Sequence, residues 1–317
     1  MSHRIQLPDN VAAHFGFEQA FGQDFSFVDD AANSRPEEPD AFIAIDPFRS
    51  HEIDDSISVR KDGTSGFIVK LATPDGSLVP ASLLEQALRR KRSDYGNGSR
   101  NVKTLLPSDL SVGALSLSDG QKRPAVVATM QLSAADGLRL VDLARRTVKS
   151  HQTTYYRLEN KALKLDPKAE NWSLLRAVNA YRESMALPAL QPGGTRVMSH
   201  FIVEHFAVGY NMLIPALAAE KGVPLLHRNF EGQDETGLFD FLAEESRGAS
   251  AKRASYSTKA IGHAAFGGMP YAQVTTPLAR ASDLFNHQQI PALLSTGESA
   301  FMFTAAQLDE VAAKLNR

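Results

Sequence analysis

The sequence of 317 residues contains no cysteine, which excludes disulfide bonds and thiolate metal sites. Its formal charge of −2 argues against a broadly basic nucleic-acid binder but leaves room for a local basic channel. We find no signal peptide, no glycine-rich phosphate loop and no serine nucleophile elbow, and we judge no apolar run long enough to span a membrane. We therefore expect a cytoplasmic protein that does not associate with membranes.

The content of 43% hydrophobic and 22% charged residues is typical of a globular protein. Neither an internal repeat nor a linker is evident after residue 40, so we expect an N-terminal arm or small appended element over residues 1–40 and one domain over 41–317. Apolar patterning predicts strands over 42–45, 53–59, 124–132 and 138–149, and helices over 82–92, 151–163, 199–221 and 235–246, with a last helix from Pro277.

Four carboxylates fall within ten residues, and they are Asp46, Glu52, Asp54 and Asp55. Clustered carboxylates repel one another, and a hard divalent cation with oxygen ligands is the common source of compensating charge. In a strand over 53–59, Asp55 would be the charged residue on the apolar face, where a buried carboxylate needs a partner or a metal. The alternative interpretation is a solvated acidic loop.

The predicted helix over 199–221 carries a polar stripe of His200, Glu204 and Asn211, which share one face. Such a stripe is either a hydrogen-bonded core network or part of a site. His200 and Glu204 have the spacing of a zinc pair, but the sequence offers no third ligand. Asp283 and His287 have the same spacing near the C-terminus, where intrahelical pairs are common on surfaces.

Two clusters of cations lie beside tyrosines, an arrangement that suits phosphate pairing and base stacking in a nucleic-acid strand. Solvated helix ends would give the same composition. The first cluster is the run RRKR at 89–92 with Tyr95, Arg100 and Lys103, and the second is Arg145, Arg146 and Lys149 with Tyr155 and Tyr156.

In combination, several segments resemble the catalytic (RNB) domain of the ribonuclease II/R family of 3′→5′ exoribonucleases, over about residues 41–290. The most specific is IDPFRSHEIDDSI, which resembles the acidic signature of that family. LLPSDLSVGALSLSDGQKRPAVVATMQLSAADG resembles its central stretch, and SHQTTYYRLEN the segment with its site tyrosine. SHFIVEHFAVGYN is similar to the I-V-E-E helix, and YAQVTTPLARASDLFNHQQI to the TSP-x-R signature.

The resemblance implies a mixed α/β (α+β) fold with β-sheets packed around a buried long helix. It also implies magnesium-dependent hydrolysis of single-stranded RNA to 5′-monophosphates. Carried over position by position, it gives the metal ligands as Asp46, Glu52, Asp54 and Asp55. It gives the catalytic residues as Asp54, Asp55, Tyr156, Glu204 and Arg280. The RNA-binding residues would be Arg92, Tyr95, Arg100 and Tyr271.

The sequence departs from the family pattern at several positions. Glu52 stands where the family has Asp, and Ala279 stands where it has the phosphate-binding Arg of TSP-x-R. Arg280 is adjacent, but neighbours on a helix point about 100° apart, so a substitute role requires a shifted loop. The Gly-x-x-x-Phe stacking segment has no clear match, and we expect neither cold-shock domains nor a C-terminal OB-fold.

These observations leave three hypotheses. The chain is a distributive, magnesium-dependent exoribonuclease. Alternatively, the RNB fold serves another hydrolysis or transfer reaction, on a tRNA-linked or small substrate. A third possibility is a non-catalytic RNA-binding protein. The retained acids favour the first hypothesis, and Ala279 opposes it. The sequence leaves the oligomeric state open.

Overall fold

The structure is a computed structural model. It describes residues 25–47, 50, 52–63, 66–94, 103–155, 158, 171–185, 198–231, 254–295 and 302–317. Tyr95, Arg100, Tyr156, the helix predicted over 235–246 and most of the helix predicted over 151–163 lie outside these ranges. Residues 151–154 of the latter belong to a strand and not to a helix.

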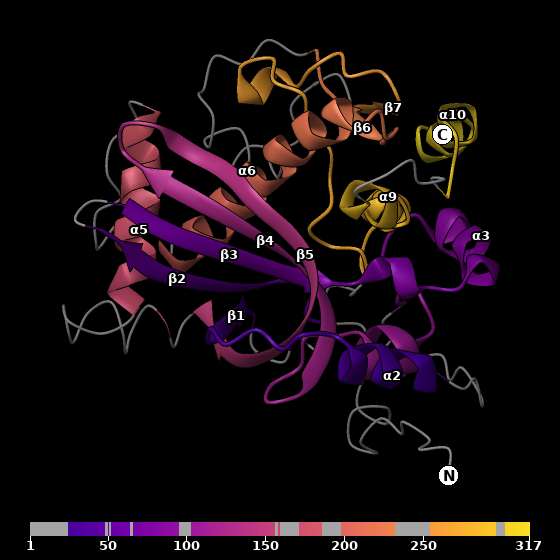
Figure 1. Cartoon of the computed structure of the whole chain (residues 1–317). Coiled ribbons are helices and arrows are strands. Elements are labelled where there is room, and N and C mark those ends of the chain that lie inside the picture. The colour runs from indigo at the N-terminus through magenta and orange to yellow at the C-terminus, as the bar shows by residue number, and fades with distance from the viewer. Residues whose placement is uncertain are drawn as a thin grey trace.

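Five strands form a closed barrel in the order β1-β2-β3-β4-β5 (Figure 1). Their bounds are β1 (Phe42–Asp46), β2 (Ser56–Asp62), β3 (Gly66–Pro74), β4 (Lys122–Ser133) and β5 (Gly137–Thr154). Neighbouring strands are antiparallel except β1 and β5, which pair in parallel and close the barrel. The strand predicted over 53–59 begins three residues later than expected, at Ser56, so Asp54 and Asp55 precede it.

Strand β4 is continuously apolar from Pro124 to Ala128, where both of its faces are buried. Val126, Ala128 and Met130 contribute to the main hydrophobic core, whereas Ala125 and Val127 pack in a second cluster on the opposite face. Successive side chains of a strand point to opposite faces, so a strand covered on both sides reads as a continuous apolar run. This burial explains why the segment PAVVATMQL was recognisable as a strand.

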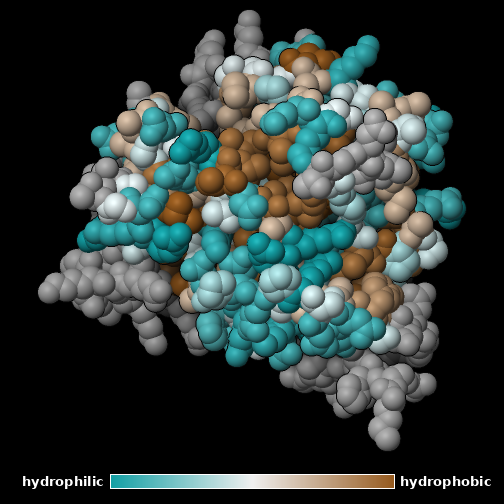
Figure 2. Space-filling model, viewed as in Figure 1, coloured by the Kyte–Doolittle hydropathy of each residue, from teal (hydrophilic) through white to brown (hydrophobic). Residues whose placement is uncertain are grey.

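Three of the described helices contribute to the main core beside the barrel, and they are α5 (Asn171–Ser184), α6 (Met198–Glu220) and the short α9 (Ile290–Leu294). Figure 1 shows α6 crossing the barrel strands, and Figure 2 shows hydrophobic surface gathered over it while hydrophilic residues cover the strands. The residues of α6 that contribute to the core are Ile202, Phe206, Tyr210, Ile214 and Ala218. The predicted mixed fold with a buried long helix is therefore confirmed.

The same helix corrects the expectation that no apolar run is long enough to span a membrane. Residues Ser199–Glu220 meet that test of length and composition, and more than half of the segment is buried inside the protein. Packing against the barrel accounts for this apolar composition, since a core helix passes the same test.

The remaining elements surround a second core at the other end of the barrel. Leu84 and Leu88 pack there with Leu284, Phe285 and Leu308. The helices that supply these residues are α3 (Ala81–Arg90), α8 (Ala281–His287) and α10 (Ala305–Leu315). The helix predicted from Pro277 therefore begins at Ala281, four residues after the predicted start, and it is α8 and not the last helix. The other elements are α2 (Ser26–Ser34) and the strand pair β6 (His227–Asn229) and β7 (Ser255–Ser257).

An acidic segment at residues 37–40 runs along the barrel and pairs with its cations. Glu38 accepts hydrogen bonds from Lys70 Nζ at 2.5 Å and from Arg146 Nε at 3.2 Å, and Lys70 also contacts Asp40 at 2.5 Å. The Glu38 side chain is only 8% exposed. Residues 25–40 are thus fixed to the barrel, and the backbone bond from Glu38 N–H to the Thr147 carbonyl reinforces the attachment.

We expect the Glu38→Gln substitution to destabilise the fold by about 1–3 kcal/mol, because it leaves two partly buried cations facing a neutral amide. Urea unfolding would measure the change. The matched control is Glu85→Gln, which removes an exposed pair with Arg89 and should have little effect. Equal effects of the two substitutions would show that the acidic segment contributes no more than a surface ion pair.

Candidate active site

The acidic cluster lies in the connection between β1 and β2, facing a segment from far along the chain. Asp46 is the last residue of β1, and Asp54 and Asp55 immediately precede β2. The backbone N–H of Leu278 donates a hydrogen bond of 2.9 Å to Asp54 Oδ1, across 224 positions of sequence. This bond holds the segment TTPLAR against the acids, so two of the motifs identified in the sequence form one site.

Glu52 and Asp54 form one acidic pair, and both side chains are committed to structural contacts. They are 8% and 7% exposed, respectively. Ser93 Oγ lies 3.1 Å from Glu52 Oε2, which accepts its hydrogen bond. Burial raises the pKa of Asp54 well above its usual range, and the charge of Glu52 raises it further, whereas the Leu278 amide opposes the shift.

Asp46 and Asp55 form a second pair whose charge is less fully compensated. Burial, followed by the charge of Asp55, raises the pKa of Asp46 to about 8. Burial raises the pKa of Asp55 to about 7, although the cationic Arg280 acts in the opposite direction. Asp46 Oδ2 is buried and has no hydrogen-bond partner in the part of the chain that the structure describes.

This second pair fits a magnesium ion, which proteins usually hold through one or two carboxylates, with water and substrate phosphate completing the shell. The buried oxygen of Asp46 that lacks a partner is the observation that supports the fit. The four predicted ligands do not converge, since no group of three or more His, Asp or Glu side chains among the described residues could hold a metal ion. The hydrogen bonds to Ser93 and Leu278 explain why Glu52 and Asp54 are directed elsewhere.

Arg280 reaches the acids because its backbone is not helical. It is the N-cap of α8, with φ −129° and ψ 131°, so the argument from helical neighbours does not apply. Its Nη2 donates to Asp283 Oδ1 at 2.9 Å and to Thr275 Oγ1 at 3.3 Å, and its charge acts on Asp55. The loop presents the charge of Arg280 to Asp55 without a shift, whereas the catalytic role of Arg280 stays a prediction.

Asp283 and His287 hold this loop in place. Asp283 Oδ1 also accepts hydrogen bonds from the backbone N–H and the hydroxyl of Thr276. His287 is fully buried, with Nε2 2.7 Å from the Val274 carbonyl and Nδ1 accepting from Gly76 N–H at 3.2 Å. Both side chains are fully buried, so Asp283 and His287 are not a surface pair, and their contacts fix the loop that carries Arg280.

The tyrosine that the structure places beside the acids is Tyr155. The charges of Asp55, Asp46 and Glu204 act on its phenol, and burial is the main cause of its raised pKa. Its ring stacks on His200 with centroids 3.8 Å apart. The tyrosine predicted for the site, Tyr156, lies outside the described residues, so its role stays a prediction. The charge of Glu204 on α6 acts on the Tyr155 phenol, and the catalytic role predicted for Glu204 also stays a prediction.

Tyr271 requires a correction as an RNA-binding residue. It is 6% exposed and packs on Phe266 and His263, with ring centroids at 4.5 and 5.4 Å. Its hydroxyl accepts a hydrogen bond from Asn211 Nδ2 at 3.1 Å, and Asn211 Oδ1 accepts from Val274 N–H. The buried ring offers no open face for a base, so Tyr271 and Asn211 form the core network that was the alternative interpretation.

The predicted basic surface is divided. Arg92 is exposed, and its backbone forms a bridge with Arg280, which places it beside the site. In the second cluster, by contrast, Arg145 pairs with Asp75 at 3.0 Å and Arg146 pairs with Glu38. Because these ion pairs neutralise Arg145 and Arg146, the two side chains attract phosphate groups less strongly.

Comparisons with known proteins agree with this architecture. Residues 38–185 match the RNB domain. The chain is 22% identical to the chloroplastic/mitochondrial ribonuclease II of Arabidopsis thaliana, over 86% of this chain and 38% of that protein. Mycoplasma genitalium RNase R bound to ribose-methylated single-stranded RNA superposes with a TM-score of 0.68, at 17% identity, covering 98% of this chain and 59% of that one. Yeast Ssd1, a pseudonuclease, gives 0.71 at 15% identity, covering 90% and 43%.

Residues 38–185 are therefore similar to the RNB domain, and the chain has the fold shared by ribonuclease R and Ssd1. It spans less than two thirds of the length of each of these relatives. Because its structural neighbours include an RNA-bound nuclease and a pseudonuclease, the fold alone leaves activity to be argued from the site.

We expect Asp46→Asn to reduce the loss of stability with rising pH, measured in EDTA. The pKa of Asp46 is raised from 3.8 to about 8, so the folded state binds its proton more tightly than the unfolded state. The free energy of unfolding therefore decreases as the pH rises between these two values. Asn cannot ionise, so the variant should gain about 1–3 kcal/mol relative to the parent at pH 8 and much less near pH 5, when the partial exposure of Asp46 is allowed for.

Urea unfolding at both pH values would measure this difference, with Asp30→Asn on α2 as an exposed control. A gain in stability of equal size at the two pH values would contradict the assignment, because it would mean that ionisation of Asp46 does not strain the fold.

Proposed function

We propose that this protein hydrolyses single-stranded RNA from the 3′ end in a magnesium-dependent and distributive reaction. The observation that carries the proposal is the hydrogen bond from Leu278 to Asp54, because it brings Arg280 to the same site as the Asp46–Asp55 pair. Two acids and one fixed cation are the groups that phosphodiester hydrolysis requires beside a metal.

Asp46 and Asp55 would hold the ion. A bound magnesium ion supplies a polarised water and takes up negative charge on the phosphoryl oxygens. Asp54 contributes from the other acidic pair, where its hydrogen bond to the backbone fixes the carboxylate and the loop that carries Asp55. The raised pKa values of these acids reflect a site that lacks positive charge in its present form.

Arg280 supplies the cation that binds the scissile phosphate or the leaving oxygen. Its guanidinium is fixed on one side by Asp283 and Thr275, and it remains 34% exposed. Preorganised donors of this kind stabilise charge that develops in the transition state without having to reorganise. The replacement of the family arginine by Ala279 is thereby compensated from the next position.

The phenol of Tyr155 and the carboxylate of Glu204 close the site from β5 and α6. Because the pKa of Tyr155 is raised, its hydroxyl stays protonated and donates a hydrogen bond at neutral pH. A phosphate oxygen or the attacking water is a suitable acceptor. The stacked ring of His200 holds the phenol in this orientation.

Weak retention of RNA between cleavages is supported by the charge pairing of the barrel surface. Arg145 and Arg146 are occupied by Asp75 and Glu38, so this part of the barrel surface attracts the RNA backbone less strongly than unpaired cations would. Distributive action follows when each cleaved strand dissociates before the next cut.

A non-catalytic role in RNA binding is the second candidate function, and the similarity to the pseudonuclease Ssd1 favours it. The retained Asp46, Asp54 and Asp55 argue against it, because a scaffold would gain nothing from burying acids with raised pKa values. Action on a tRNA-linked or other small substrate would use the same acids with a different leaving group.

We expect Asp54→Asn to abolish magnesium-dependent release of mononucleotides from 5′-labelled single-stranded RNA. Asn keeps an oxygen that can accept the Leu278 N–H, so the variant should fold while lacking the charge at this position. A denaturing gel of reactions with magnesium and with EDTA would measure the effect. An intact RNA band with the folded parent protein would exclude the exonuclease, whereas tight RNA binding by both proteins without cleavage would favour the scaffold.

We expect Arg280→Ala to lower kcat by about 100-fold or more, since it removes one preorganised donor at the reacting phosphate. Arg92→Ala is the matched control, because it removes a neighbouring exposed cation and should mainly raise KM. Initial rates over a range of RNA concentrations would separate the two effects. If Arg280→Ala changed only KM, Arg280 would be a binding residue and not part of the catalytic group.

A further inference from the structure

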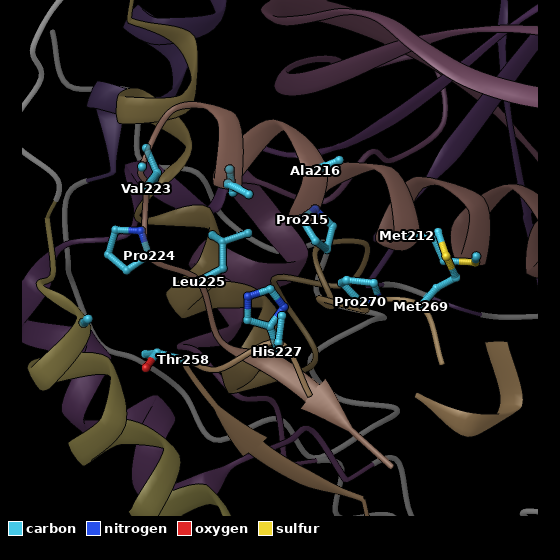
Figure 3. Close-up of a pocket in the computed structure, with 15 residues that line it drawn as sticks. Met212, Pro215, Ala216, Val223, Pro224, Leu225, His227, Thr258, Met269 and Pro270 are labelled. Atoms are coloured by element: carbon cyan, nitrogen blue, oxygen red, sulfur yellow. The ribbon is translucent and has the colours of Figure 1, made fainter. Parts of the chain in front are cut away.

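The apolar pocket beside α6 does not extend the candidate active site (Figure 3). It has a volume of about 530 Å³ and is lined by residues that include Met212, Pro215 and Leu225, with no Asp, Glu, Lys or Arg among the described lining residues. Such a surface offers no compensating charge to an anionic substrate. A turn at the end of α3, by contrast, contacts both halves of the site.

The turn is centred on Lys91, the C-cap of α3. Among the described residues, Lys91 is the only one other than glycine with a positive φ, and its φ is 62° and its ψ −42°. The N–H of Arg92 donates a hydrogen bond of 2.8 Å to the carbonyl of Arg90, which closes a three-residue γ-turn around Lys91. This form of the γ-turn is rare and strained, and strain of this kind persists only where the surrounding structure enforces it.

A short ladder of hydrogen bonds enforces the turn. The carbonyl of Lys91 accepts a hydrogen bond of 2.8 Å from Ala281 N–H, and Ser93 N–H donates one of 2.8 Å to the carbonyl of Ala279. The two segments thereby pair in an antiparallel bridge centred on Arg280. Each of the residues that flank Arg280 is therefore bonded to the segment that leaves α3.

The ladder accounts for the extended backbone of Arg280. Its φ of −129° and ψ of 131° are those of a strand residue, as expected when both neighbours are hydrogen-bonded to a second segment. From this conformation the guanidinium donates to Asp283 and Thr275, and its charge acts on Asp55. The turn at Lys91 thus fixes the conformation on which the position of this cation depends.

The same segment also contacts the acidic connection. Ser93 is 8% exposed, and its hydroxyl donates to Glu52 Oε2 at 3.1 Å while accepting from Leu105 N–H at 2.8 Å. Residues 91–93 therefore join Glu52 to the loop that carries Arg280. A different backbone conformation at Lys91 would move Ser93 and the ladder together.

The charge of Lys91 offers an alternative role, since an ammonium group in the basic run at 89–92 would also attract RNA phosphates. That role requires no strained backbone, so the γ-turn favours a backbone role. We propose that Lys91 is a positioning residue for the proposed nuclease reaction, on which this inference rests, and that it acts through its backbone turn by holding Arg280 at the site. The lysine charge is dispensable for this role, whereas the positive φ is not.

The test compares two substitutions that both remove the charge of Lys91. Glycine adopts a positive φ without steric cost, whereas a β-branched valine strongly disfavours it. With single-stranded RNA and magnesium, we expect Lys91→Gly to keep kcat and KM within about twofold of the parent values, and Lys91→Val to lower kcat by about tenfold or more at nearly unchanged KM. A raised KM with unchanged kcat in Lys91→Gly would overturn the proposal and assign the lysine charge to RNA binding, an outcome that does not require Lys91→Val to fold. Equal losses of kcat in the two variants would also overturn it.

Amide hydrogen exchange, followed by NMR, tests the ladder without RNA hydrolysis. The N–H groups of Ser93 and Ala281 should exchange at the parent rate in Lys91→Gly and about tenfold or more faster in Lys91→Val. Lys314→Val, at an exposed position in the last turn of α10, controls for the replacement of a lysine by valine and should change neither exchange nor kcat. Parental exchange rates in Lys91→Val would overturn the proposal. If the parent protein leaves RNA intact, faster exchange in Lys91→Val still shows that the turn fixes the ladder, so failure of the nuclease proposal and failure of this inference are distinguishable.

A double substitution tests whether Lys91 acts through Arg280. In an Arg280→Ala background, Lys91→Val should lower kcat by no more than about twofold, because the group that the turn positions is absent. A further loss as large as that in the parent protein would contradict this route.

Discussion

The hydrogen bond from Leu278 N–H to Asp54 is the constraint on which the rest of the site depends. It joins the connection between β1 and β2 to a segment more than 200 residues later, and it opposes the rise in the pKa of Asp54 that burial and Glu52 produce. The same segment presents Arg280, whose extended N-cap backbone directs the guanidinium to Asp283 and Thr275. A single backbone contact thus sets the relative position of the acids and of their nearest cation.

The electrostatics of the site follow from this arrangement. Four carboxylates in one connection would repel one another, and the fold reduces that repulsion by separating them into two pairs. Glu52 and Asp54 accept hydrogen bonds from Ser93 and Leu278, and the buried Oδ2 of Asp46 has no hydrogen-bond partner among the described residues. A divalent cation between Asp46 and Asp55 would relieve part of this unfavourable charge. This chain thus retains Asp46 and Asp55, the two acids that we propose bind the metal ion.

Much of this structure could be predicted from local pattern. The apolar runs of β4 and α6 identify a strand and a core helix, and the acidic and TTPLAR motifs identify the two halves of the site. What could not be predicted depends on long-range contacts. Only the fold shows that Arg280 has an extended backbone, that the charges of the acids act on Tyr155, and that Tyr271 is enclosed by Phe266 and His263. Burial of this kind has no signature in sequence spacing.

The most direct test of the account is a crystal structure of the Asp54→Asn protein with Mn²⁺ and a short single-stranded RNA. Anomalous scattering would locate the metal independently of the protein density. The account predicts a metal peak between Asp46 and Asp55, with an RNA phosphate within hydrogen-bonding distance of Arg280. A metal bound elsewhere, or RNA that enters the site without approaching Arg280, would contradict the claim that these groups act together on a phosphodiester.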